Sequence, residues 1–125
     1  MLAERRRRRR RQVGPVEPDL LVVNRLEYEV TGNAGPLVAV THGAEGAVLL
    51  ENGEEVARAV PPQVDAVDGT AAGDAFTACL VVSLVEGRPR EEALCRACAA
   101  GALAASKPGA QPSLPTAAEI DRILA

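Results

Sequence analysis

The sequence predicts one α/β domain in which helices are layered on a β-sheet. Short, nearly continuous apolar runs come first, as in the buried strands of a parallel sheet. Longer apolar segments of helical character follow, and loops rich in small residues lie where strands should end. A chain of 125 residues is long enough for one such domain with one core, and it contains no evident internal repeat or second domain.

The strands are expected in the first half of this domain. Residues 20–23 and 37–41 are typical of buried strands, and the segment between them leaves room for a short crossover helix. Residues 46–50 and 55–60 flank an Asn-Gly pair, which is the strongest short-range signal for a β-hairpin. The two prolines that follow should end the pairing, because proline has no N–H to donate.

Helices are expected in the second half. Residues 71–86 and 89–106 read as two apolar helices separated by Gly87, and Pro89 suits a first helical turn. A short last helix is expected to begin at Pro115 and to run to residue 124. Hydrophobic residues make up 47% of the chain but aromatic residues only 2%, so the core has to be built from Ala, Val and Leu.

The start of the chain differs in charge from the rest. Residues 5–11 are seven consecutive arginines, and without them the net charge of −3 becomes −10. Such a tail could bind nucleic acid, anionic lipid or the acidic body, but we favour a disordered tail over residues 1–18. No aromatic residue lies among the arginines, so base stacking has no support.

The sequence also bears on where the protein is found. No apolar run reaches the roughly 18 residues of a transmembrane helix. Prolines break the segment after the arginines, where a signal peptide would continue with an apolar stretch. We therefore expect a cytoplasmic protein with no membrane partner.

Three cysteines, Cys79, Cys95 and Cys98, allow two interpretations. Cys95 and Cys98 form a Cys-x-x-Cys pair that could point to a metal or redox site. However, the chain has a single histidine and no second cysteine pair, whereas zinc takes about four ligands. We therefore expect the cysteines to pack in the core as small apolar residues.

The segment from Asp68 to Asp74, with the sequence Asp-Gly-Thr-Ala-Ala-Gly-Asp, carries the strongest functional signal. Its small residues Ala71, Ala72 and Gly73 open an apolar helix and leave the first backbone N–H groups bare. The helix dipole adds a positive field there, so the segment is expected to form an anion pocket. The carboxylate of Asp74 beside a bound phosphate suits phosphoryl transfer. The alternative is an ordinary helix start with an acid that suits the dipole.

Three further motifs accompany this segment. Asn24 and Glu27 form an Asn-x-x-Glu motif, residues 41–46 form a Thr-x-Gly-x-x-Gly turn, and residues 109–113 precede Pro115. With residues 68–76, these motifs resemble those of the ribokinase (PfkB) family of carbohydrate kinases, in the family's order. The resemblance covers residues 19–125 and implies a three-layer α/β/α fold, of which the chain would be the C-terminal, nucleotide-binding part.

The resemblance implies an ATP-dependent sugar kinase, with ribose as the expected acceptor. Asp74 would be the catalytic base, and the N–H groups of Ala71, Ala72 and Gly73 would form the anion hole. ATP and Mg²⁺ would be held at positions spread along the chain, with Glu27 reaching the metal through water: Asn24, Glu27, Thr41, Gly43, Gly46, Gly73 and Cys98. A K⁺ ion would be bound by two side chains, Asp68 and Ser113, and by four carbonyls: Thr70, Ala104, Lys107 and Gly109.

Two positions depart from the family pattern. Gly69 stands where most members have Thr, and glycine loosens the backbone by up to about 1 kcal/mol. Cys98 stands where members often have Asn or His, so we expect weaker recognition of the adenine base.

The resemblance does not extend to the family's N-terminal half, which carries the sugar-binding segment and the lid. The expected partners are therefore another chain that supplies that half or a second copy in a homodimer, because the surface left uncovered predicts self-association. Two non-catalytic alternatives remain open at this point. The chain could be a nucleotide-binding remnant, or an interaction module that acts through its arginine tail.

Overall fold

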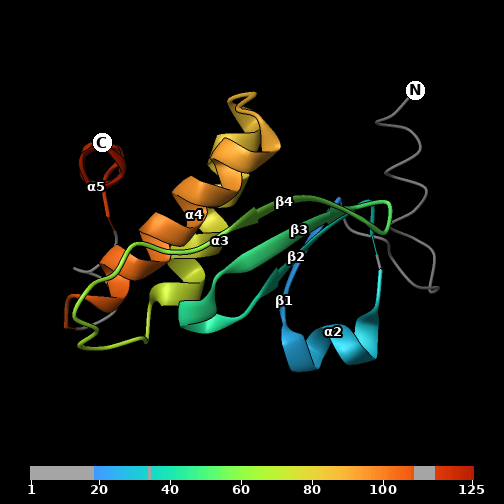
Figure 1. Cartoon of the computed structure of the whole chain (residues 1–125), viewed down its shortest axis with the longest axis horizontal. Helices are drawn as coiled ribbons and strands as arrows, with labels where there is room; N and C mark the ends of the chain where they lie inside the picture. The colour runs from blue at the N-terminus through green and yellow to red at the C-terminus, as the bar shows by residue number, and fades with distance from the viewer. Residues whose placement is uncertain (1–18, 34, 109–114) are drawn as a thin grey trace, which may run out of the picture.

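A mixed four-stranded sheet with helices on both faces forms the centre of the computed structural model, which describes residues 19–33, 35–108 and 115–125 (Figure 1). The strands lie in the order in which they occur in the chain, with β1 parallel to β2 and the other neighbours antiparallel. They are β1 (Leu20–Asn24), β2 (Leu37–Thr41), β3 (Ala47–Glu51) and β4 (Glu54–Ala59).

The helices follow the sequence expectations closely. A short helix crosses between the two parallel strands, and two long helices pack on each other after β4. Their bounds differ from the expected ones by one or two residues, which is the usual uncertainty at helix ends. They are α2 (Arg25–Thr31), the 3₁₀ turn η1 (Gly43–Glu45), α3 (Ala72–Val85), α4 (Arg90–Ala105) and α5 (Ala117–Leu124).

The side chains of β2 show how the layers are divided. Val38 and Val40 belong to an apolar cluster that Tyr28 of α2 completes. Ala39 points the other way, as alternation along a strand requires, and shares a larger cluster with Phe76 and Leu80 of α3. The sheet is therefore covered by α2 on one face and by α3 and α4 on the other, which confirms the α/β fold class.

The hairpin between β3 and β4 confirms the expectation from its Asn-Gly pair. Asn52 and Gly53 both have positive φ, 52° and 86°, as a type I′ turn requires. The turn therefore sets the antiparallel register in which Glu51 lies opposite Glu54. The arginine tail, with its expected disorder over residues 1–18, lies outside the described residues.

Helix α3 carries an apolar stripe on its outer surface. Val81, Val82 and Val85 are 43%, 54% and 82% exposed, although the helix also buries Phe76 and Leu80 on its inner side. Apolar side chains all around a helix are usual where both sides are covered. The stripe is consistent with the predicted self-association, which stays a prediction. None of the helices in the described ranges combines the length and apolar character needed to cross a bilayer.

Candidate functional site

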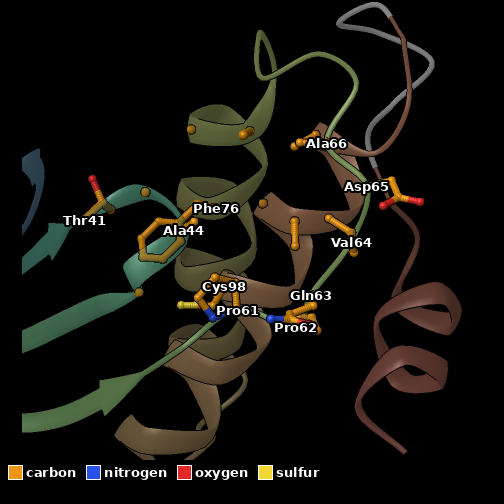
Figure 2. Close-up of a pocket in the computed structure, with 17 residues that line it drawn as sticks. Thr41, Ala44, Pro61, Pro62, Gln63, Val64, Asp65, Ala66, Phe76 and Cys98 are labelled. Atoms are coloured by element: carbon orange, nitrogen blue, oxygen red, sulfur yellow. The ribbon is translucent and has the colours of Figure 1, made fainter.

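A pocket with a volume of about 880 Å³ lies where the sheet meets the two long helices (Figure 2). Three segments line it. The first is the turn after β2, the second is the connection after β4 (61–66), and the third combines the start of α3 with the second half of α4. Of the residues expected to bind the nucleotide or the phosphoryl group, the pocket brings together Thr41, Gly43, Gly46, Ala72, Gly73 and Cys98.

The turn after β2 depends on two glycines with positive φ. Gly43 and Gly46 have φ of 60° and 114°, where side chains are disfavoured. A Cβ atom on Gly46 would lie 2.2 Å from the carbonyl oxygen of Ala59, at the end of β4. Gly46 therefore allows the turn to approach β4 closely, which brings Thr41 and Gly43 to one wall of the pocket.

The opposite wall is the start of α3, which has no side-chain cap. Ala71 occupies the N-cap position and makes no capping hydrogen bond. Ala72 N–H donates to the carbonyl of Gly69 at 3.2 Å, whereas within the described residues the N–H groups of Gly73 and Asp74 have no acceptor. A Cβ atom on Gly73 would find no atom within 4 Å, and the residue is exposed.

Asp74 lies in the first turn of this helix, directly after Gly73, and its side chain is exposed. An uncapped helix start provides donors and a positive field for an anion. The structure thus places a carboxylate beside a site where phosphate can bind. Of the three N–H groups expected to form the anion hole, that of Ala72 is already used by Gly69, and that of Asp74 is an additional donor.

The expected K⁺ ligands lie where the chain entering α3 meets the end of α4. Val67 and Asp68 both donate their N–H groups to the carbonyl of Ala105, at 2.7 and 3.0 Å. Asp68 Oδ1 accepts from the N–H of Thr70 at 3.0 Å. Ala104, Lys107 and Thr70 are therefore near Asp68 in the fold, while Gly109 and Ser113 lie outside the described residues.

Asn24 and Glu27 form the capping box of α2. Asn24 Oδ1 accepts from the N–H of Glu27 at 2.8 Å, and Glu27 Oε1 accepts from the N–H of Asn24 at 2.9 Å. Neither residue lines the pocket, but Asn24 is the β-register partner of Thr41, which does. Glu27 is exposed, and its second oxygen has no partner in the described part of the chain, so it can hold a water of a metal ion.

Cys98 is buried in the core cluster and also lines the pocket. Its thiol is 3.9 Å from the carbonyl oxygen of Ala59. Burial, with a smaller contribution from Cys95, raises the pKa of Cys98 to about 12, so the thiol is neutral at physiological pH. Burial also raises the pKa of the Cys79 thiol. Core packing is confirmed for Cys98, and Cys79 and Cys95 pack against the same cluster.

The sequence did not identify the wall formed by the connection after β4. Its residues Pro61, Pro62 and Val64 give the pocket an apolar side, together with Phe76 of α3 (Figure 2). The prolines were interpreted only as strand breakers. Gly101, inside an alanine-rich helix, was a usable signal, because such a glycine often marks close packing. A Cβ atom there would lie 3.3 Å from the carbonyl oxygen of Ala72.

Comparison with known proteins places the chain among carbohydrate kinases. Residues 21–117 match the family described as pfkB family carbohydrate kinase. The ribokinase of Arabidopsis thaliana is 39% identical over 88 residues, which are 70% of this chain and 23% of that protein. The 5-dehydro-2-deoxygluconokinase of Bacillus subtilis is 30% identical over 93 residues, or 74% of this chain and 29% of that protein.

Comparison with solved structures gives the same family relationship. The ribokinase of Thermotoga maritima matches with a TM-score of 0.75 and 30% identity over 85% of this chain and 42% of that chain. The Arabidopsis thaliana ribokinase complexed with ribose and ATP matches with a TM-score of 0.76 and 32% identity over 85% and 40%. The chain spans about a quarter of the length of these curated relatives and about two fifths of these solved chains. Most of the chain nevertheless lies within the family match, so it belongs to the pfkB family of carbohydrate kinases.

Proposed function

We propose that this chain forms the ATP-binding and phosphoryl-transfer side of a sugar kinase. One observation carries the proposal. The carboxylate of Asp74 lies at an uncapped helix start where the N–H groups of Gly73 and Asp74 are available, beside a pocket large enough for a nucleotide. The turn from Thr41 to Gly46 supplies the second wall, where the nucleotide phosphates and ribose would lie. Family membership supports both assignments.

In this proposal Asp74 accepts the proton of the sugar hydroxyl as the hydroxyl attacks the γ-phosphate. The N–H groups of Gly73 and Asp74, with that of Ala71, donate to the oxygens of the transferred group. The transition state of phosphoryl transfer is loose, so positioning and charge stabilisation contribute more than the strength of the base. Cys98, as a neutral thiol, would face the nucleotide in an otherwise apolar wall.

The proposal extends to two metal ions. Glu27 would hold Mg²⁺ through water near Thr41, and this ion would neutralise phosphate charge. Asp68 and the carbonyls near it would hold K⁺, which would support the anion turn (68–73) against the end of α4. For comparison, a putative ribokinase II from E. coli, 25% identical, has been solved with ATP and Mg²⁺.

Ribose is the proposed acceptor. One structural relative holds ribose and ATP, and several curated relatives are ribokinases. Other relatives act, by their names, on different carbohydrates, such as 5-dehydro-2-deoxygluconate and fructose. A carbohydrate hydroxyl is therefore the better supported substrate class, and ribose is the finer proposal within it.

Isothermal titration of ATP·Mg²⁺ into the chain, with and without K⁺, tests the proposal. We expect binding that strengthens with K⁺, whereas no binding by the folded chain in either buffer would contradict the proposal. A coupled assay with ribose then separates a kinase from a non-catalytic nucleotide-binding remnant. Holding the acceptor in line supplies much of the rate, so we expect less than about a tenth of a longer relative's turnover from these residues alone. That residual turnover should vanish in Asp74→Asn, while ATP binding remains.

A further inference from the structure

A small apolar cluster lies behind the anion turn, where α3, α4 and α5 meet. Its members are at most 5% exposed, and they come from all three helices. Ile120 of α5 is the one side chain larger than a methyl group among the buried members that the structure describes. The others are alanines: Ala71, Ala75, Ala99, Ala100 and Ala104. Because Ala71 belongs to the anion turn, the turn shares its buried packing with α5.

Alanine methyl groups cannot rotate to fill a space, so the shape of this cluster depends on the depth at which Ile120 enters it. Helix α4 contributes Ala99, Ala100 and Ala104 to the cluster, so removal of the one large buried side chain leaves a void that the neighbouring side chains fill only in part. The void would lie in the cluster that holds Ala71, the residue before the first turn of α3.

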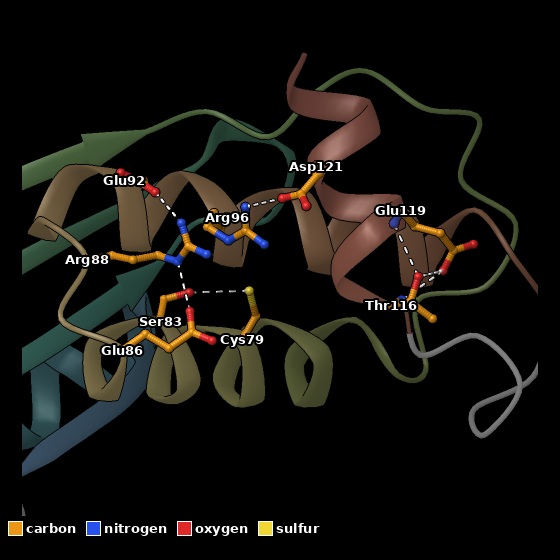
Figure 3. A network of polar contacts seen from close by, with 9 residues as sticks. All are labelled: Cys79, Ser83, Glu86, Arg88, Glu92, Arg96, Thr116, Glu119 and Asp121. Atoms are coloured by element: carbon orange, nitrogen blue, oxygen red, sulfur yellow. Dashed lines mark hydrogen bonds and ion pairs between the residues drawn. The ribbon is translucent and has the colours of Figure 1, made fainter.

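Two ion pairs attach α5, one to α4 and one to Lys107, which lies just beyond the end of α4. Arg96 Nη1 donates to Asp121 Oδ1 at 2.6 Å, and Lys107 Nζ donates to Glu119 Oε2 at 2.9 Å. The Arg96 side chain is only 10% exposed, whereas that of Asp121 is 63% exposed (Figure 3). A mostly buried guanidinium that lost its partner would be strongly unfavourable, so this pair fixes where α5 sits. Asp121 follows Ile120 in the chain, so the same contact sets the depth of the isoleucine.

The rest of the anion turn is attached to α4. The N–H groups of Val67 and Asp68 donate to the carbonyl of Ala105 where the chain enters the turn. Gly101 of α4 approaches the carbonyl of Ala72 closely, since a Cβ atom there would be 3.3 Å away. Helix α4 therefore fixes the turn by hydrogen bonds and close backbone contact, and α5 adds Ile120 to the cluster that contains Ala71.

We propose that α5 positions the phosphate-binding turn. In this role Ile120, held at its depth by the Arg96–Asp121 pair, keeps Ala71 in place and so orients the free N–H groups of Gly73 and Asp74. Ile120 is a positioning residue that touches no substrate. The inference rests on the proposed function for its consequence in ATP binding, but its structural part can be tested on the free protein.

Amide hydrogen exchange of the free chain tests that part. Ile120→Ala should accelerate exchange at the hydrogen-bonded amides around the start of α3, those of Ala72 and Ala75, by about tenfold or more, because loss of the buried side chain lowers the free energy of local opening. Leu49→Ala, a deletion in the separate core cluster, is the matched control and should leave these amides unchanged at a comparable loss of Tm. If Ile120→Ala does not fold, Ile120→Val replaces it in the experiment, and we expect a smaller acceleration of exchange at the same amides. Equal acceleration in the Leu49 variant, or none in either Ile120 variant, would overturn the proposal.

Titration of ATP·Mg²⁺ well below the Tm of every variant tests the consequence. Asp121→Asn should weaken binding by about fivefold, or about 1 kcal/mol, whereas Asp121→Glu should restore it and Arg122→Gln should not change it. A purely structural role would lower Tm and leave the affinity of the folded protein intact, which would contradict the proposal. Faster exchange in a chain whose native form binds no ATP would instead contradict the proposed function and leave the positioning role standing.

Discussion

The first turns of α3 and α5 are built in opposite ways. Helix α5 begins with a capping box, in which Thr116 Oγ1 accepts from the N–H of Glu119 and Glu119 Oε1 accepts from the N–H of Thr116 (Figure 3). Helix α3 begins with small residues, and no side chain caps it. Both starts leave backbone N–H groups to be satisfied, and of the two only α5 has a side chain that accepts from one of them.

At α3 the absence of a cap leaves donors available beside the pocket. A cap contributes roughly 1 kcal/mol to stability and occupies the donors that an anion would need. Helix α2 follows the pattern of α5, because Asn24 and Glu27 cap it in the same way. Helix α4 also begins without a side-chain cap, at Pro89, but the pocket lies at the start of α3. An uncapped helix start therefore indicates a phosphate site only together with the pocket beside it.

The largest effect is expected from making α3 resemble α5. Gly73→Asp would place a carboxylate at an open position in the first turn of α3, where a Cβ atom meets nothing within 4 Å. The helix dipole should stabilise the fold by about 0.3–1 kcal/mol. Repulsion from the phosphates should weaken ATP·Mg²⁺ binding by about a hundredfold or more, as measured by isothermal titration.

The control for that variant is Ala118→Asp, which adds the same charge to the exposed first turn of α5. It should leave the affinity for ATP unchanged. Equal losses of affinity in the two variants would mean that net charge matters and that the uncapped start of α3 does not.

A smaller effect is expected from removing a cap. Thr116→Ala should lower the free energy of unfolding by about 1 kcal/mol, which corresponds to about 4–8 °C in Tm for a domain of this size. Thr116→Ser should keep the cap and most of the stability. Thermal unfolding followed by circular dichroism measures both variants. An unchanged Tm in Thr116→Ala would contradict the claim that the capping box stabilises the fold.

The smallest effect concerns pH. The hydrogen bond from Thr116 N–H, followed by that from Lys107, lowers the pKa of Glu119 below 4.5. A lowered pKa in the folded state stabilises the fold above the unfolded value and loses that contribution as pH falls. The stability difference between the native chain and Glu119→Gln should therefore be constant above about pH 5 and shrink below it. A difference that grows on acidification would contradict the assignment.

The sequence predicted the parts of this molecule that depend on local chemistry. The hairpin followed from the φ that Asn52 and Gly53 adopt readily, and the uncapped start of α3 followed from the small residues before Asp74. The capping of α5 could also have been predicted, because Thr116 and Glu119 have the spacing of a capping box. Such features need only a few neighbouring residues, so no knowledge of packing is required.

The sequence could not predict what depends on contacts between distant segments. The apolar wall formed by Pro61, Pro62 and Val64 exists because the connection after β4 runs beside α4, which no local pattern indicates. The hydrogen bond from the Ala72 N–H to the carbonyl of Gly69 depends on the backbone conformation of the turn. That Ile120 shares a buried cluster with Ala71 depends on how α5 packs on α4, where Arg96 pairs with the distant Asp121.

The most direct test of the central claim is a titration of the ¹⁵N-labelled chain with ATP·Mg²⁺, in which the amide shifts of all helix starts are followed together. The account predicts that the largest shifts occur at Gly73 and Asp74, while the capped amides of Glu27 and Glu119 stay in place. Shifts that are absent at α3, or that are as large at the capped helices, would contradict the claim that the uncapped start of α3 is the phosphate site.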